Sequence, residues 1–293
     1  MIKSITIIVA IYSMLLSIGI SVSSGETILF QNGLQVNGLI YGGTQDTYTG
    51  EGYPNMTYGS ARETHTLRAP IFPYAMECTV LIKFDDLGKF LPDNFVVQSA
   101  RIGFTICEYV SRGAVNIEVA ELLKPWDNTD LTWTQDGLGN QWSRAGALGI
   151  DANGVISADR SDVVMDSVLV PAETEPYGNP WWWNVDPNMV QRWIRNDNSN
   201  YGVVFYCPRD SDGSIVVVGR AGTIGLFGEN WIPLRPQLEV TGFVATQCSD
   251  FIENNKDYAE DFNHDCLIDT KDLESFVESW LACNDPQNPA CSN

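Results

Sequence analysis

Short runs of β-branched and aromatic residues recur between turns rich in Gly, Pro, Asn and Asp, and they limit the fold more than any other feature. The runs are CTVLIKF, SARIGFTICEYV, AVNIEVAELL, DVVMDSVLV, YGVVFYC, SIVVVG and RPQLEVTGFV. Several alternate apolar with polar residues, so that Ile102, Phe104 and Ile106 fall on one face. Such runs predict β-strands, and the alternation predicts one buried and one solvated face. We expect an all-β fold, a two-sheet β-sandwich or jelly roll, over residues 26–245.

One segment, WWWNVDPNMVQRWIRNDNSN, departs from the strand pattern. Asp186 is a favourable N-cap, and Pro187 suits the first position of a helix. Apolar residues then follow at helical spacing: Met189, Val190, Trp193 and Ile194. We expect one short helix of about two turns, whose apolar face closes one end of the sandwich.

The first 24 residues predict export from the cytoplasm. Lys3 precedes an apolar run from Ile5 to Val22, and small residues follow it. This layout is typical of a secretory signal peptide, here 1–24, with cleavage at about residue 23 or 24. The alternative is a membrane anchor, but serines and glycines dilute the run and no basic cluster follows it. The mature protein is then secreted or at the cell surface, and it is not bound to a membrane.

Charge and cysteine content narrow the partners and divide the chain. The net charge is −20, from 17 basic and 37 acidic residues, and such a surface repels nucleic acid and anionic membranes. Seven cysteines in an exported chain predict disulfides. Cys78, Cys107 and Cys207 fit either buried thiols or one disulfide and a remaining thiol. The other four lie in the acidic segment 248–293, which we expect to be a separate unit: Cys248, Cys266, Cys283 and Cys291.

Within that unit, DFNHDCLIDTKD has the spacing of an EF-hand calcium loop. The expected side-chain ligands are Asp261, Asn263, Asp265, Asp269 and Asp272, with the backbone carbonyl of Leu267. Oxygen-only ligands favour calcium over zinc or copper. An apolar stripe at helical spacing follows the loop: Leu273, Phe276, Val277, Trp280 and Leu281. We expect a small α-helical calcium module stabilised by metal and disulfides, the alternative being a solvated acidic turn.

The central region resembles a known family of secreted β-sandwich modules, the DNRLRE-domain proteins. The segments that carry the resemblance, in order, are DTYTGEGYPNMTYGS, VLIKFDDLGKFLP, VVQSARIGFTI, IEVAELLKPWDNTDLTW, WNVDPNMVQRWIRNDNSNYGVVFY and RPQLEVTG. The resemblance implies a sandwich that serves as a non-catalytic part of exported proteins, in some cases binding carbohydrate. The chain departs from the family in the insertion RAPIFPYAMEC, in Asn128 and in lacking the literal six-letter signature, which bears on any inherited ligand site more than on the fold.

The tail is similar to dockerin modules, in particular to a variant that carries a cysteine in the loop. Cys266 at loop position 6 and Asp272 at position 12, both unusual for an EF-hand, fit that variant. The resemblance implies calcium as a cofactor and a cohesin-like or cell-surface protein as partner. The preceding SDFIENNKDYAE is at best a degenerate first loop, whereas a standard dockerin has two loops.

Nine tryptophans suggest carbohydrate binding, because sugars stack their apolar faces on exposed indole. The cluster Trp181, Trp182 and Trp183 is the expected glycan site, and Trp126, Trp133 and Trp142 are further candidates. Because side chains alternate along a strand, Trp181 and Trp183 share one face and Trp182 occupies the other. The alternative for each of these tryptophans is a place in the core.

No recognisable catalytic motif is present in the sequence. Two pairs of acids, Asp85 with Asp86 and Glu118 with Glu121, are candidates for a glycosidase pair, although solvated positions explain them equally simply. We therefore expect a secreted, non-catalytic protein that binds polysaccharide or acts as an extracellular scaffold. The alternatives are a polysaccharide lyase or glycoside hydrolase, and a purely structural surface or adhesion protein.

Overall fold

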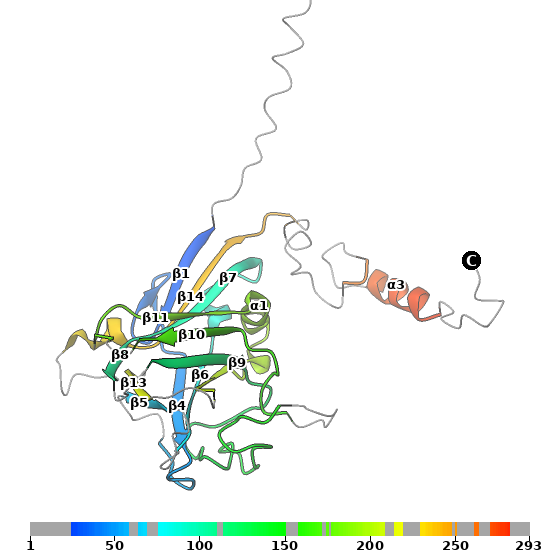
Figure 1. Ribbon diagram of the computed structural model, residues 1–293. Coiled ribbons are helices and arrows are strands. Elements are labelled where there is room, and N and C mark those ends of the chain that lie inside the picture. The colour runs from blue at the N-terminus through cyan, green and yellow to red at the C-terminus, as the bar shows by residue number, and fades with distance from the viewer. Residues whose placement is uncertain are drawn as a thin grey trace, which may run out of the picture.

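The chain folds mainly into antiparallel β-sheets (Figure 1). The computed structural model describes residues 25–58, 64–68, 76–109, 114–150, 158–171, 174–175, 177–208, 214–218, 229–247, 250, 261–263 and 270–281. The expected signal peptide and the four tail cysteines lie outside these residues. The prediction of a mostly β fold is confirmed, and two facing sheets are compatible with the expected sandwich.

The smaller sheet has four antiparallel strands in the order β1-β14-β7-β11. Their bounds are β1 (Glu26–Gln31), β14 (Gln237–Val244), β7 (Phe95–Phe104) and β11 (Trp181–Val185). The first and last long strands of the sandwich therefore lie side by side, as Figure 1 shows.

The larger sheet has the order β10-β9-β12-β6-β5-β13-β8, and β4 also pairs with β6. The bounds are β4 (Thr44–Gly50), β5 (Thr64–Arg68), β6 (Cys78–Phe84), β8 (Ile106–Tyr109), β9 (Val115–Glu121), β10 (Asp166–Val170), β12 (Val203–Tyr206) and β13 (Ser214–Val218). The smaller elements are the hairpin β2 (Gln35–Val36) and β3 (Leu39–Ile40), and the 3-10 turns η1 (Leu87–Lys89), η2 (Asp197–Ser199) and η3 (Glu229–Leu234).

The main hydrophobic core lies between the two sheets. The smaller sheet contributes Phe104 and Trp183, and the larger sheet contributes Phe205; all three are fully buried. Their rings meet edge to face, with centroids 4.8 Å apart for Phe104 and Phe205 and 5.4 Å for Trp183 and Phe205. This geometry adds a specific aromatic attraction to the burial of apolar surface, so these residues join the two layers.

A second core covers the outer face of the larger sheet. Trp126, Trp133 and Trp142, on the long segment after β9, pack over outward residues of β6, β9 and β12. Buried Asp159 holds this segment in shape, because its carboxylate accepts hydrogen bonds from the backbone N–H groups of Ser143, Arg144 and Gly149. The outer face of β12 is therefore dry, so the expectation of one wet face does not hold there, and the three tryptophans belong to this core.

The predicted helix between the sandwich strands is present as α1 (Pro187–Arg195). The Asp186 carboxylate caps it by accepting a 2.8 Å hydrogen bond from the Asn188 N–H. All four residues of the expected apolar face are buried: Met189, Val190, Trp193 and Ile194. Buried Gln191 fixes the helix to β7, accepting from the Val97 N–H and donating to the Phe95 carbonyl.

The tail contains a helix, α3 (Thr270–Leu281), at the position that the apolar stripe predicts. It lies apart from the sheets (Figure 1). Leu273 and Val277 are exposed, whereas the ring of Phe276 contacts Phe262, with centroids 5.0 Å apart. Within the described residues, then, only part of the stripe is covered.

Candidate functional site

The three consecutive tryptophans of β11 have different environments. Trp183 is fully buried, and its indole N–H donates a 3.0 Å hydrogen bond to the Ile117 carbonyl on the facing sheet. Trp181, on the same face, is partly buried against the main core. Trp182 is half-buried on the opposite face, the outer face of the smaller sheet. Trp183 thus fills the core, and only Trp181 and Trp182 have surface available to a ligand.

Trp182 is held against β7 by its neighbours. Gly103 lies directly opposite it, and a Cβ at that position would come within 2.8 Å of the indole ring. The absence of a side chain at Gly103 therefore lets the indole lie close to the strand. The Arg101 guanidinium is 4.4 Å from the ring centroid, a cation–π distance. Trp182 is thus a positioned aromatic ring that keeps some exposure.

A row of polar side chains extends from Trp182 across the outer face. Arg101 donates two hydrogen bonds to the Glu239 carboxylate on β14, at 2.7 and 3.0 Å. Asn184 lies opposite Arg101 on β11, and these residues, with Ser99, line a hollow of about 250 Å³. The hollow offers a guanidinium, a carboxylate, an amide and a hydroxyl to a hydrogen-bonding ligand.

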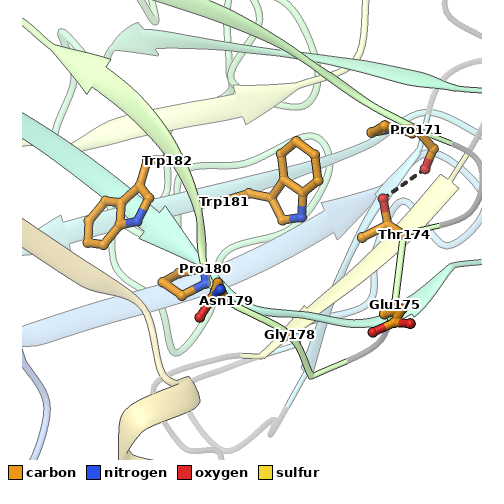
Figure 2. Close-up of a pocket in the computed structure, with 8 residues that line it drawn as sticks. All are labelled: Pro171, Thr174, Glu175, Gly178, Asn179, Pro180, Trp181 and Trp182. Atoms are coloured by element: carbon orange, nitrogen blue, oxygen red, sulfur yellow. Dashed lines mark hydrogen bonds between the residues drawn. The ribbon is translucent and has the colours of Figure 1, made fainter.

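A larger cleft, of about 630 Å³, lies beside the two tryptophans (Figure 2). Its lining consists of Pro171, Thr174, Glu175, Gly178, Asn179, Pro180, Trp181 and Trp182. Figure 2 shows Trp181 between Trp182 and the segment that carries Pro171 and Thr174. A hydrogen bond of 2.8 Å from the Thr174 hydroxyl to the Pro171 carbonyl braces that segment. The cleft has the size of a typical ligand pocket and combines aromatic with polar surface.

The strand that carries the tryptophans is tied to the other sheet. The Asp166 carboxylate on β10 accepts from the Asn184 backbone N–H at 2.7 Å and from its side-chain amide at 2.9 Å. The edges of the two sheets are therefore joined next to the cleft. A site on this face rests on regular strands, which hold side chains more precisely than loops do.

The expected calcium loop is described only in part. Asp261 and Asp272, the first and last expected ligands, are both buried, at 2% and 3% exposure. The Asn263 N–H donates to Asp272 Oδ1 at 3.3 Å, so the two ends of the loop approach each other. Asp265, Leu267 and Asp269 lie outside the described residues. Elsewhere in the described part of the chain, no cluster of three or more His, Cys, Asp or Glu side chains is placed to hold a metal.

The oxygen donors that are described fit a hard cation. Two carboxylates and an asparagine converge at the start of α3, and carboxylate and amide oxygens are the ligands that calcium prefers. Burial of charged carboxylates is costly unless hydrogen bonds or a cation compensate. The calcium assignment therefore stays a prediction that these three residues are compatible with.

The acid pairs suggested by the sequence do not form two matching sites. Glu118 and Glu121 lie three residues apart on β9, so they point to opposite faces, and Glu121 is bound by Arg192 at 2.7 Å. Asp85 instead meets an acid that the sequence did not suggest, Asp197 of η2.

Asp85 lies in a polar hollow of about 250 Å³ between β6 and η2. Burial raises the pKa of its carboxyl, the Lys83 ammonium 3.5 Å away opposes this rise, and Asp197 adds to it. Asp197 also accepts a 3.1 Å hydrogen bond from the Asp86 backbone N–H. Two acids in one hollow with different environments are a feature that acid–base catalysis can use.

Sequence reasoning missed the partners of Trp182. Arg101, Gly103 and Glu239 come from β7 and β14, far from β11 in the chain. The outward position of Arg101 could be read from the alternation in SARIGF, but its alignment with Trp182 depends on strand order.

No protein-family model matches the chain, and no curated protein matches it. Among the described residues, which begin at residue 25, no helix has the length and apolar character needed to cross a membrane. Inference about function therefore rests on the residues and their geometry.

Proposed function

We propose that the chain is an exported, non-catalytic β-sandwich protein that binds a polysaccharide through the outer face of the smaller sheet. Residues 1–24 serve as the export signal in this proposal. The sandwich has the jelly-roll character of DNRLRE-like modules, and residues 248–293 form a dockerin-like module stabilised by calcium. Through that module the protein attaches to a cohesin-like or cell-surface protein.

The observation that carries the proposal is the arrangement of Trp182, Arg101 and Glu239 beside the cleft of Trp181. An indole edge and face can pack on the apolar face of a sugar ring. The guanidinium donates to sugar hydroxyls and the carboxylate accepts from them, so one pair serves both kinds of hydrogen bond. The two neighbouring hollows, which meet at the Arg101–Trp182 contact, provide room for more than one sugar unit.

The expected ligand is a neutral polysaccharide. The net charge of −20 disfavours a strongly anionic polymer, and Glu239 already neutralises the one guanidinium that faces the hollow among the lining residues described. A neutral chain can use the paired Arg101 and Glu239 without disrupting their ion pair.

The test is retention of the full chain on a panel of soluble and insoluble polysaccharides. Trp182→Ala should weaken retention at least tenfold, a loss of about 1.4 kcal/mol, and Trp181→Ala should weaken it as well. Tyr53→Ala is a matched control, because it removes an exposed aromatic ring from the loop after β4, in the other sheet. Absence of retention on every glycan, or equal retention by all variants, would leave a structural or adhesive role as the explanation.

The second candidate function is that of a carbohydrate-active enzyme, favoured by the hollow that Asp85 and Asp197 share. In this case the protein should release reducing or unsaturated ends from a polysaccharide, and Asp85→Asn should abolish the release. A binding protein should release none.

A further inference from the structure

We infer that Cys78 and Cys207 form a cross-strand disulfide between β6 and β12 when the chain is in an oxidising compartment. The inference rests on the proposed export, because thiols in the cytoplasm are kept reduced. It selects one pair from three cysteines whose pairing the sequence left open. The structure holds all three as thiols.

Strand register brings the two residues together. β12 pairs antiparallel with β6, from Val203 opposite Ile82 to Phe205 opposite Val80. Continuing this register by two residues places Cys207 opposite Cys78. Opposite residues in antiparallel strands have Cα atoms roughly 4.5–5.5 Å apart, and disulfides span about 4.4–6.8 Å. The backbone of the pair is therefore within the range that a disulfide needs.

Both side chains are on the inner face of the sheet. Cys78 is two residues from Val80, and Cys207 is two residues from Phe205, so each shares the face of a residue in the main core. Cys207 belongs to this core and is fully buried, while Cys78 is half-buried. Burial raises the pKa of Cys207 above its ordinary value, and Cys78 is the next largest cause, which fits two neighbouring sulfurs.

The present position of the Cys78 sulfur identifies the movement required. Its Sγ lies 3.8 Å from the Met76 carbonyl, and a Cβ at Gly50 of β4 would be 3.0 Å from it. The sulfur thus lies on the β4 side of β6, in space left by a glycine. Rotation about the Cα–Cβ bond of Cys78 turns the sulfur from β4 toward β12, with no change in strand pairing.

The oxidation proceeds by exchange with a small-molecule disulfide such as oxidised glutathione. Cys78, the more accessible thiol, loses its proton and attacks one sulfur, which forms a mixed disulfide and releases one glutathione thiolate. The Cys207 thiolate then attacks the Cys78 sulfur and releases the second. Two protein thiols are oxidised, one small-molecule disulfide is reduced to two thiols, and the protons balance.

Cys107 serves as an internal control. It lies on β8, which the sheet order separates from β6 by β13 and β5. Its thiol is buried, and burial raises its pKa to about 11, so little thiolate is present at neutral pH. We expect Cys107 to remain a thiol under conditions that join the other two.

The test is peptide mapping of the full chain after incubation with oxidised glutathione, alkylation and digestion by trypsin without reduction. Cleavage after Arg68 and Lys83 isolates Cys78, and cleavage after Arg195 and Arg209 isolates Cys207. The expected product is a peptide 69–83 linked to peptide 196–209, which separates on reduction. Cys107→Ser should retain this product, and Cys78→Ser and Cys207→Ala should each lose it.

Recovery of both peptides in alkylated form after oxidation, or their linkage to other cysteines, would overturn the inference. Because the oxidant is added to purified protein, this result is independent of export and of glycan binding. Failure of polysaccharide retention would count against the proposed function while leaving the linked peptide unaffected.

Discussion

The sandwich and the tail are held together by different kinds of interaction. Residues from both sheets form one apolar core around Trp183, Phe104 and Phe205, so the sandwich is stabilised by buried area. In the described part of the tail, the inward contacts are two buried carboxylates, an asparagine N–H and one pair of phenylalanine rings. A small unit with this little apolar burial needs another source of stability, which we expect to be calcium and disulfides. The comparison teaches that the same chain should respond to metal in one region and to core substitution in the other.

The largest effect should come from the core of the sandwich. Trp183→Ala removes a fully buried indole and its hydrogen bond to Ile117, and should lower the free energy of unfolding by about 3–5 kcal/mol. Trp182→Ala, on the half-buried outer face, should cost clearly less. Denaturant unfolding of the two variants measures the difference. Equal losses would mean that the two faces of β11 are equally buried and that Trp182 is not a ligand platform.

The second effect should be confined to the tail. In the full chain, Asp261→Ala together with Asp272→Ala removes the first and closing carboxylates of the expected loop. Calcium binding should weaken at least tenfold, by about 1.4 kcal/mol or more, in isothermal calorimetry. The unfolding midpoint of the sandwich should not change. Glu278→Ala is the control, because that acid is exposed on α3 and is not an expected ligand.

Two results would contradict this prediction. If the unaltered protein with its disulfides intact binds no calcium at millimolar metal, the loop is only an acidic turn. If calcium instead raises the stability of the sandwich in the double variant, the relevant metal site is not in the tail, and the contrast between the two regions fails.

The smallest effect should come from the cap of α1. Asp186→Ala removes the carboxylate that accepts from the Asn188 N–H, and should cost about 1 kcal/mol. Asp186→Asn keeps an acceptor at the same place, and should cost less. Thermal or denaturant unfolding distinguishes the two variants. No loss in either variant would show that the helix start does not limit the stability of the sandwich, although Gln191 and the apolar face still fix it to β7.

Local pattern in the sequence was sufficient for several features. The strand runs, the start of α1 at Pro187 with Asp186 as its cap, and the helix after the acidic loop all follow from spacing and backbone preference within a few residues. The alternation of Trp181, Trp182 and Trp183 between two faces also follows from strand geometry alone.

Only the tertiary structure decided which of those two faces is core. The indole of Trp183 is buried because β11 lies at the edge of a sheet that faces the other across the core, and Trp182 becomes a possible platform because β7 presents Gly103 and Arg101 beside it. Likewise, Trp126, Trp133 and Trp142 are buried because a long segment folds over the outer face of β12. Strand order and the packing of one layer on another depend on contacts between residues far apart in the chain, and the local preferences from which strands and helices are predicted contain no information about them.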